Sequence, residues 1–129
     1  MRLLDRFPRW FLLLIWATVV ILFTTLPQPF PFVRTLARLL GGNDVGDAIG
    51  HAALFGSLTL LVYWTLRLRL RFEAAFWLAV GMVFMLSTAT EFSQQFIDGR
   101  TLTLSDLLAN WVGVLAIATI VSFRARTSV

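Results

Sequence analysis

The sequence predicts an all-α polytopic membrane protein, built as a four-transmembrane-helix bundle with a short interfacial helix between helices 1 and 2. Three observations predict it. Of the 129 residues, 58% are hydrophobic and only 14% are charged, unlike an ordinary soluble domain. The hydrophobic residues lie in four long runs. All 11 basic residues are Arg, and they lie mostly between these runs, as membrane topology signals do.

Length and composition also limit the function. A chain of 129 residues is predicted to form a single domain, residues 1–129. The absence of Cys excludes disulfides, thiolate metal sites and a Cys nucleophile. The net charge of +4 does not indicate a nucleic-acid partner, because the Arg residues are not gathered on one basic helix or tail. No HExxH-type spacing is present, so we predict no metal and no cofactor.

The first transmembrane helix is predicted over residues 10–26, a run of 17 residues without a charge. At about 1.5 Å per residue it spans roughly 25 Å, a little less than a typical bilayer core. A cleaved signal peptide is the alternative. The apolar run is longer than a normal signal-peptide core, and Thr24-Thr25-Leu26-Pro27 is a poor cleavage site, so an uncleaved helix is favoured.

A short interfacial helix is predicted over residues 32–40. Pro27, Pro29 and Pro31 prevent the first helix from continuing. Beyond them, one face is apolar and another carries Arg34 and Arg38, which is typical of a helix lying on the membrane surface.

The second transmembrane helix is predicted over residues 48–66, with Asp47 as its N-cap. Four small residues near its start lie close to one face and would allow close helix packing: Gly46, Gly50, Ala53 and Ser57. The alternative is that the glycines only serve the preceding loop.

The third and fourth transmembrane helices are predicted over residues 72–97 and 104–123. Asp98-Gly99-Arg100 forms the turn between them, and Thr103 or Ser105 can cap the fourth helix.

Arg counts predict the orientation. Eight Arg residues lie before the first helix, between the second and third, or after the fourth, whereas three lie on the other side. The positive-inside rule then places both termini of this multi-pass membrane protein in the cytoplasm. On this topology, His51, Glu91, Asp106 and Asn110 all lie in the outer third of the bilayer.

Polar groups are costly in lipid, so these residues are expected to face one another in an outward-opening pocket. The predicted ligand-binding residues are His51, Glu91, Gln94, Arg100, Asp106 and Asn110. The catalytic residues are unknown, with His51, Glu91 and Asp106 as candidates. Each residue also has a structural interpretation: Asp106 as part of a Thr103-x-x-Asp106 capping box, Asn110 as interhelical hydrogen-bond partner, and Arg100 as interfacial anchor or partner of Glu91.

Two motifs carry a family resemblance. Glu91-x2-Gln94, Asp98-Gly99-Arg100, Asp106, Asn110 and Gly113 resemble the second motif of the VanZ-like family of small polytopic bacterial membrane proteins. Asp47-x3-His51 followed by Phe55 resembles its first motif. The chain departs from the family at Ala48, where Lys is frequent, and at Ile117, where Gly is common. The resemblance implies a link to low-level teicoplanin resistance, and no established biochemical mechanism.

Three functions compete at this point. The protein could bind a membrane lipid, a lipid-linked cell-wall precursor or an amphiphilic glycopeptide at its outer face. It could be an intramembrane hydrolase or transferase that uses His51 with Glu91 or Asp106. It could also be a structural or accessory subunit whose polar residues only lock the helices together. The sequence favours the first and leaves the oligomeric state open.

Overall fold

Helices make up nearly all of the described part of the computed structural model, which covers residues 8–26, 35, 44–98 and 101–127. The helices are α1 (Arg9–Thr25), α3 (Asp44–Leu66), α4 (Phe72–Gln94) and α5 (Leu104–Thr127). Of these, α3, α4 and α5 are long and apolar enough to cross a membrane, and α1 is apolar but shorter, with 17 residues. The predicted fold class is confirmed. The expected interfacial helix lies outside the described residues except for Thr35, which has a helical backbone.

Three predicted helix ends are wrong. α5 continues to Thr127, four residues past the predicted end at residue 123. α3 begins at Asp44, so Asp47 lies inside the helix and is not its N-cap. The first turn of a helix, whose N–H groups have no intrahelical partner, can be formed by polar residues. A helix can therefore start before its apolar run does. α4 ends at Gln94, because the N–H groups of Phe96 and Ile97 bond to carbonyls three residues back, which tightens the chain into turns.

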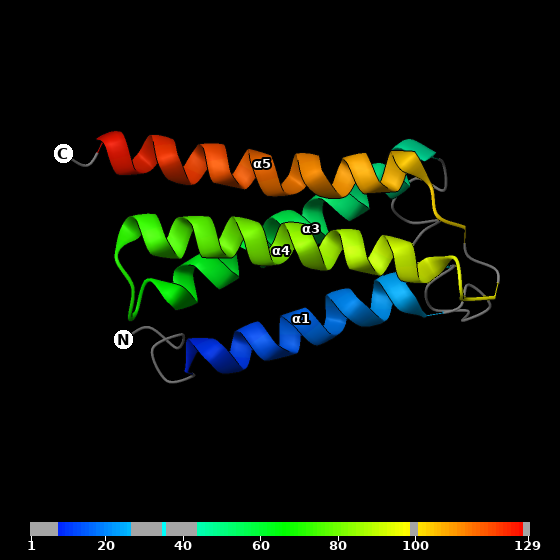
Figure 1. Ribbon diagram of the computed structural model, residues 1–129, viewed down its shortest axis with the longest axis horizontal. Coiled ribbons are helices and arrows are strands. Elements are labelled where there is room, and N and C mark those ends of the chain that lie inside the picture. Colours follow the sequence, from blue (N-terminus) through cyan, green and yellow to red (C-terminus); the bar gives the residue numbers. More distant parts are fainter. Residues whose placement is uncertain (1–7, 27–34, 36–43, 99–100, 128–129) are drawn as a thin grey trace.

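The helices run antiparallel in chain order, so α1 and α4 point one way and α3 and α5 the other (Figure 1). Thr25, Asp44, Gln94 and Leu104 therefore lie at one end of the bundle, which we call the Gln94 end. The opposite end, the Arg9 end, carries Arg9, Arg67, Arg69, Arg71, Arg124 and Arg126. This separation of charge agrees with the grouping of Arg residues expected from the sequence.

α3 is the central helix, because its contacts with the other three are the most extensive, above all those with α5. A core of buried side chains fills the space between α1, α3, α4 and α5: Val20, Phe55, Leu58, Val62, Ala79, Val83 and Val114. α1 is held to α3 by polar contacts as well. The Trp16 indole N–H donates to Ser57 Oγ at 3.0 Å, and the Arg9 guanidinium lies 4.1 Å from the ring centre of Trp64.

The close contact between α3 and α5 depends on glycine. A Cβ atom on Gly113 would overlap the backbone of Ala52, and one on Gly56 would lie 3.1 Å from the Gly113 carbonyl oxygen. By contrast, a Cβ on Gly50 would meet no atom within 4 Å, and Ala53 is exposed. Of the predicted packing face, Gly50 and Ala53 therefore make no close helix contact, whereas Gly46 is buried and the Ser57 hydroxyl contacts Trp16 of α1. The small residues that pack closely against α5 are Ala52 and Gly56, which also stand four apart on a helix and lie about 100° around the axis from Ala53 and Ser57.

Candidate functional site

Three polar side chains from three helices meet near the Gln94 end of the bundle. His51 comes from α3, Glu91 from α4 and Asn110 from α5. Glu91 is three residues from the end of α4, about 5 Å along the axis, and Asn110 is six residues from the start of α5, about 9 Å. His51 is seven residues into α3, about 10 Å. We call these residues the polar triad.

Hydrogen bonds join the polar triad in a fixed order. The Asn110 amide group donates from Nδ2 to Glu91 Oε1 at 2.9 Å. The Asn110 amide oxygen, Oδ1, lies 2.9 Å from Nδ1 of His51. His51 Nδ1 is also 3.4 Å from Glu91 Oε1. Asn110 therefore stands between the other two and contacts both at hydrogen-bonding distance.

The side chains of the triad are almost entirely buried inside the bundle. Glu91 and Asn110 are 0% exposed, whereas the His51 side chain keeps 13% of its surface. A buried carboxylate in a membrane helix costs several kcal/mol in free energy unless partners satisfy it. The Asn110 amide supplies one such partner, and His51 is the member of the triad that a ligand can reach.

The close approach of α3 and α5 places two members of the triad. His51 directly precedes Ala52, and Asn110 comes three residues, about one turn, before Gly113. Because the backbones touch at Ala52 and Gly113, the side chains of His51 and Asn110 on the adjacent turn come within hydrogen-bonding distance. Gly113 has no side chain that could take part in the site, yet it positions His51 and Asn110 by letting the two helices approach.

A second polar contact joins α4 to α5 one turn closer to the Arg9 end. The Trp111 ring stacks on Phe84 with centres 4.7 Å apart, and its indole N–H donates to Thr88 Oγ1 at 3.2 Å. Thr88 is three residues before Glu91, and Trp111 directly follows Asn110. This contact therefore keeps the helices that carry Glu91 and Asn110 in register.

Gln94 lies on the same helix as Glu91 but faces another neighbour. Its side-chain amide is buried and donates from Nε2 to the backbone carbonyl oxygen of Thr24, at 3.0 Å, near the end of α1. The Thr24 hydroxyl is buried as well and donates to the Val20 carbonyl in its own helix. In the described structure Gln94 therefore ties α1 to α4.

Asp106 lies one turn from Asn110 towards the Gln94 end. Its backbone N–H donates to Thr103 Oγ1 at 3.1 Å, which identifies Thr103 as the N-cap of α5. Among the described residues, no hydrogen bond joins the Asp106 carboxylate to the triad. Arg100 lies outside the described residues.

The structure therefore brings together His51, Glu91 and Asn110 from the predicted set, and places Gln94 and Asp106 in other contacts. Their ligand-binding and catalytic roles stay predictions. Sequence reasoning missed Thr24, Thr88 and Trp111, for which the only signals were hydroxyls in apolar runs and a Trp beside Asn110. Within the described residues, no three His, Asp or Glu side chains are grouped so that they could hold a metal ion.

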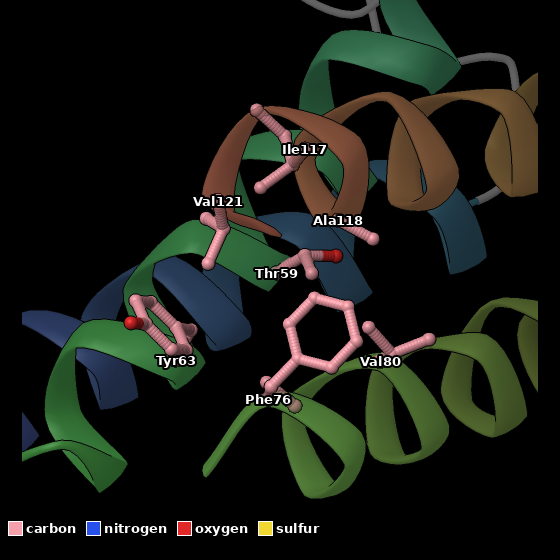
Figure 2. Close-up of a pocket in the computed structure, with 8 residues that line it drawn as sticks. Thr59, Tyr63, Phe76, Val80, Ile117, Ala118 and Val121 are labelled. Carbon is pink, nitrogen blue, oxygen red and sulfur yellow. The ribbon is translucent and has the colours of Figure 1, made fainter. Parts of the chain in front are cut away.

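A separate hollow lies between α3, α4 and α5, nearer the Arg9 end (Figure 2). The lining residues are apolar or carry a single hydroxyl: Thr59, Tyr63, Phe76, Ala79, Val80, Ile117, Ala118 and Val121. Its volume is about 10 Å³, close to the least that admits one water molecule. The Thr59 hydroxyl already donates to the Phe55 carbonyl, so the hollow offers little to a polar ligand.

Comparison with known proteins identifies the family. No curated protein and no solved structure matches the chain. A family model described as VanZ/LLP1 matches residues 9–125, which include all of the triad and nearly all of the four helices. The resemblance seen in the two motifs is thereby confirmed, and the chain belongs to the VanZ/LLP1 family.

Proposed function

We propose that this VanZ/LLP1-family membrane protein binds the polar head of an amphiphile at the triad, on the outer face of the bacterial cytoplasmic membrane. The candidate ligands are a membrane lipid, a lipid-linked cell-wall precursor and an amphiphilic glycopeptide such as teicoplanin. The observation that carries the proposal is a fully buried carboxylate and amide, linked to a partly exposed His, at one level of three apolar helices. Ionisable groups at such a depth are typical of functional sites in membrane proteins.

The outer-face location rests on charge. Six Arg residues gather at the Arg9 end of the described bundle, and the triad lies near the opposite end. Because Arg-rich ends stay in the cytoplasm, the triad is expected to open outward. A ligand bound there would keep its apolar part in lipid, beside the exposed hydrophobic side chains of α4 and α5 such as Phe92 and Leu108.

A binding role is favoured over the hydrolase or transferase interpretation. Among the described residues, the hydrogen bonds and ion pairs of His51 reach only Asn110 and Glu91, and none of them joins His51 to a Ser or Thr hydroxyl that it could activate as a nucleophile. The second alternative, a purely structural lock, uses the same hydrogen bonds and is separated from binding only by experiment.

Glu91→Gln is the test, because it removes the charge while keeping the shape and an oxygen that can accept from Asn110. We expect native mass spectrometry of the detergent-purified protein to show a lipid-mass adduct on the wild type. The Asn110 amide would then donate to an uncharged oxygen, and the weakening of this charge-assisted hydrogen bond should reduce the adduct about tenfold in the variant. Cells that produce the variant should also lose any protection against teicoplanin.

The matched control is Glu73→Gln, which makes the same change at an exposed position of the same helix, near the Arg9 end. This variant should keep both adduct and protection, and both variants should reach the membrane at the wild-type level. A Glu91→Gln protein that retains the adduct and protects cells fully would show that the triad is structural and would overturn the proposal.

A further inference from the structure

The hydrogen bonds of the triad have a direction, and this direction determines where the proton on His51 lies. The group of Asn110 that faces Glu91 is the amide nitrogen, Nδ2, which donates to Glu91 Oε1. The oxygen of the same amide, Oδ1, then faces His51. Because an amide oxygen only accepts, Nδ1 of His51 must carry the hydrogen.

The other ring nitrogen of His51 is left available. Nε2 makes no hydrogen bond with the described residues, and the side chain keeps 13% of its surface exposed. In the neutral ring, a proton on Nδ1 leaves a lone pair on Nε2. Both neighbours of the ring within the triad, the Asn110 amide oxygen at 2.9 Å and Glu91 Oε1 at 3.4 Å, lie beside Nδ1, so Nε2 is the ring nitrogen left for a ligand.

We propose that Asn110 is a positioning residue that holds His51 with its proton on Nδ1, so that Nε2 accepts a hydrogen bond from a hydroxyl of the bound head group. The inference rests on the proposed function and narrows its ligand to a class. A head group rich in hydroxyls, such as a sugar or glycerol, supplies the donor that Nε2 needs. A phosphate diester has only acceptors and would leave Nε2 unsatisfied.

His51 is the only His in the chain, so nitrogen-15 labelling of histidine reports on this residue alone. We would record the ring nitrogen resonances of the full-length protein in phosphatidylcholine nanodiscs, whose lipid carries a phosphate diester and no hydroxyl in its head. The expected spectrum has a protonated Nδ1 and an unprotonated Nε2. A protonated Nε2, in the other neutral form or in imidazolium, would overturn the proposal. This measurement is made on the wild-type protein.

The ligand class is tested by adding a minor fraction of one of two lipids to the nanodiscs. Glucosyl diacylglycerol has hydroxyls and no phosphate, and should shift the Nε2 resonance. Dihexadecyl phosphate has an ionised phosphate diester and no hydroxyl, and should not. The opposite pattern would overturn the proposed ligand class. If native mass spectrometry shows a lipid adduct but neither lipid moves Nε2, the inference fails while the proposed function stands; without any adduct, the proposed function itself fails.

Asn110→Leu separates positioning from simple support of the fold. The variant removes the acceptor for Nδ1–H, so the proton should redistribute towards Nε2 and the response to the glucosyl lipid should disappear. Trp16→Phe is the control, because it removes the hydrogen bond to Ser57 between α1 and α3, and α1 carries no member of the triad. An Asn110→Leu spectrum that matches the wild type would show that Asn110 does not set the proton position.

Discussion

At the scale of single residues, Glu91 and Asn110 depend on each other. Each is fully buried, and the amide of Asn110 donates to the carboxylate at 2.9 Å. Replacing either one alone with Leu leaves the other in an apolar setting without this partner. Replacing both removes the mismatch, so the double variant should be less unstable than the two single losses added together, by about 1 kcal/mol in the free energy of unfolding.

Unfolding of the variants by SDS in mixed micelles would measure this coupling. Thr119→Val provides the comparison when it is combined with Glu91→Leu. Thr119 is exposed, its hydroxyl donates to the Leu115 carbonyl of its own helix, and it lies well along α5 from the triad. That pair should be additive. Additivity for Glu91 and Asn110 as well would mean that the two side chains do not contact each other in the membrane.

At the scale of helices, the contact between α3 and α5 limits where side chains can be added. Gly113→Ala places a methyl group into the backbone of Ala52, so the helices must separate. We expect a loss of about 1–3 kcal/mol in the free energy of unfolding, as for other overpacked positions. The separation should also lengthen the contact between His51 and Asn110, and the nitrogen-15 spectrum of His51 should change with it.

Gly50→Ala tests the same helix at a position without neighbours. A Cβ there meets no atom within 4 Å, and Ala is the better helix former, so stability should stay equal or rise by up to about 1 kcal/mol. The two variants add the same methyl group and differ only in what it meets. Equal destabilisation of both variants would contradict the structure, in which Ala52 and Gly56 face α5 and Gly50 does not.

At the scale of the whole molecule, the Arg distribution predicts how the bundle lies in the membrane. Reporter fusions at Gly42 and at Gly99 should both report the outer side, and fusions at Arg69 and after Val129 the cytoplasm. A cytoplasmic signal at Gly42 or Gly99 would contradict the topology and place the triad at the inner face. The proposed ligand would then have to come from the inner leaflet.

Some features of this protein follow from the sequence by itself, because they depend on local composition. Long apolar runs separated by Arg residues determine the order and approximate ends of the four long helices, three of which are long and apolar enough to cross a membrane. Antiparallel order then determines that His51, Glu91 and Asn110 lie at similar depth near one end. Depth along a helix is a matter of counting residues at about 1.5 Å each, and counting needs no tertiary structure.

Only the tertiary structure decided which faces meet. A soluble helix shows its buried face by a contrast between polar and apolar sides, but here the lipid-facing side and the core-facing side are both apolar. Small-residue spacing fits the face through Gly50 as well as the face through Ala52 and Gly56, so the sequence could not choose between them. For the same reason, the sequence could not predict the partners of the polar side chains on α4. Gln94 bonds to Thr24 of α1, whereas Glu91 bonds to Asn110 of α5. The rotation of each helix about its axis is set by close packing, as at Gly113, and by hydrogen bonds between helices, and both exist only once the helices are assembled.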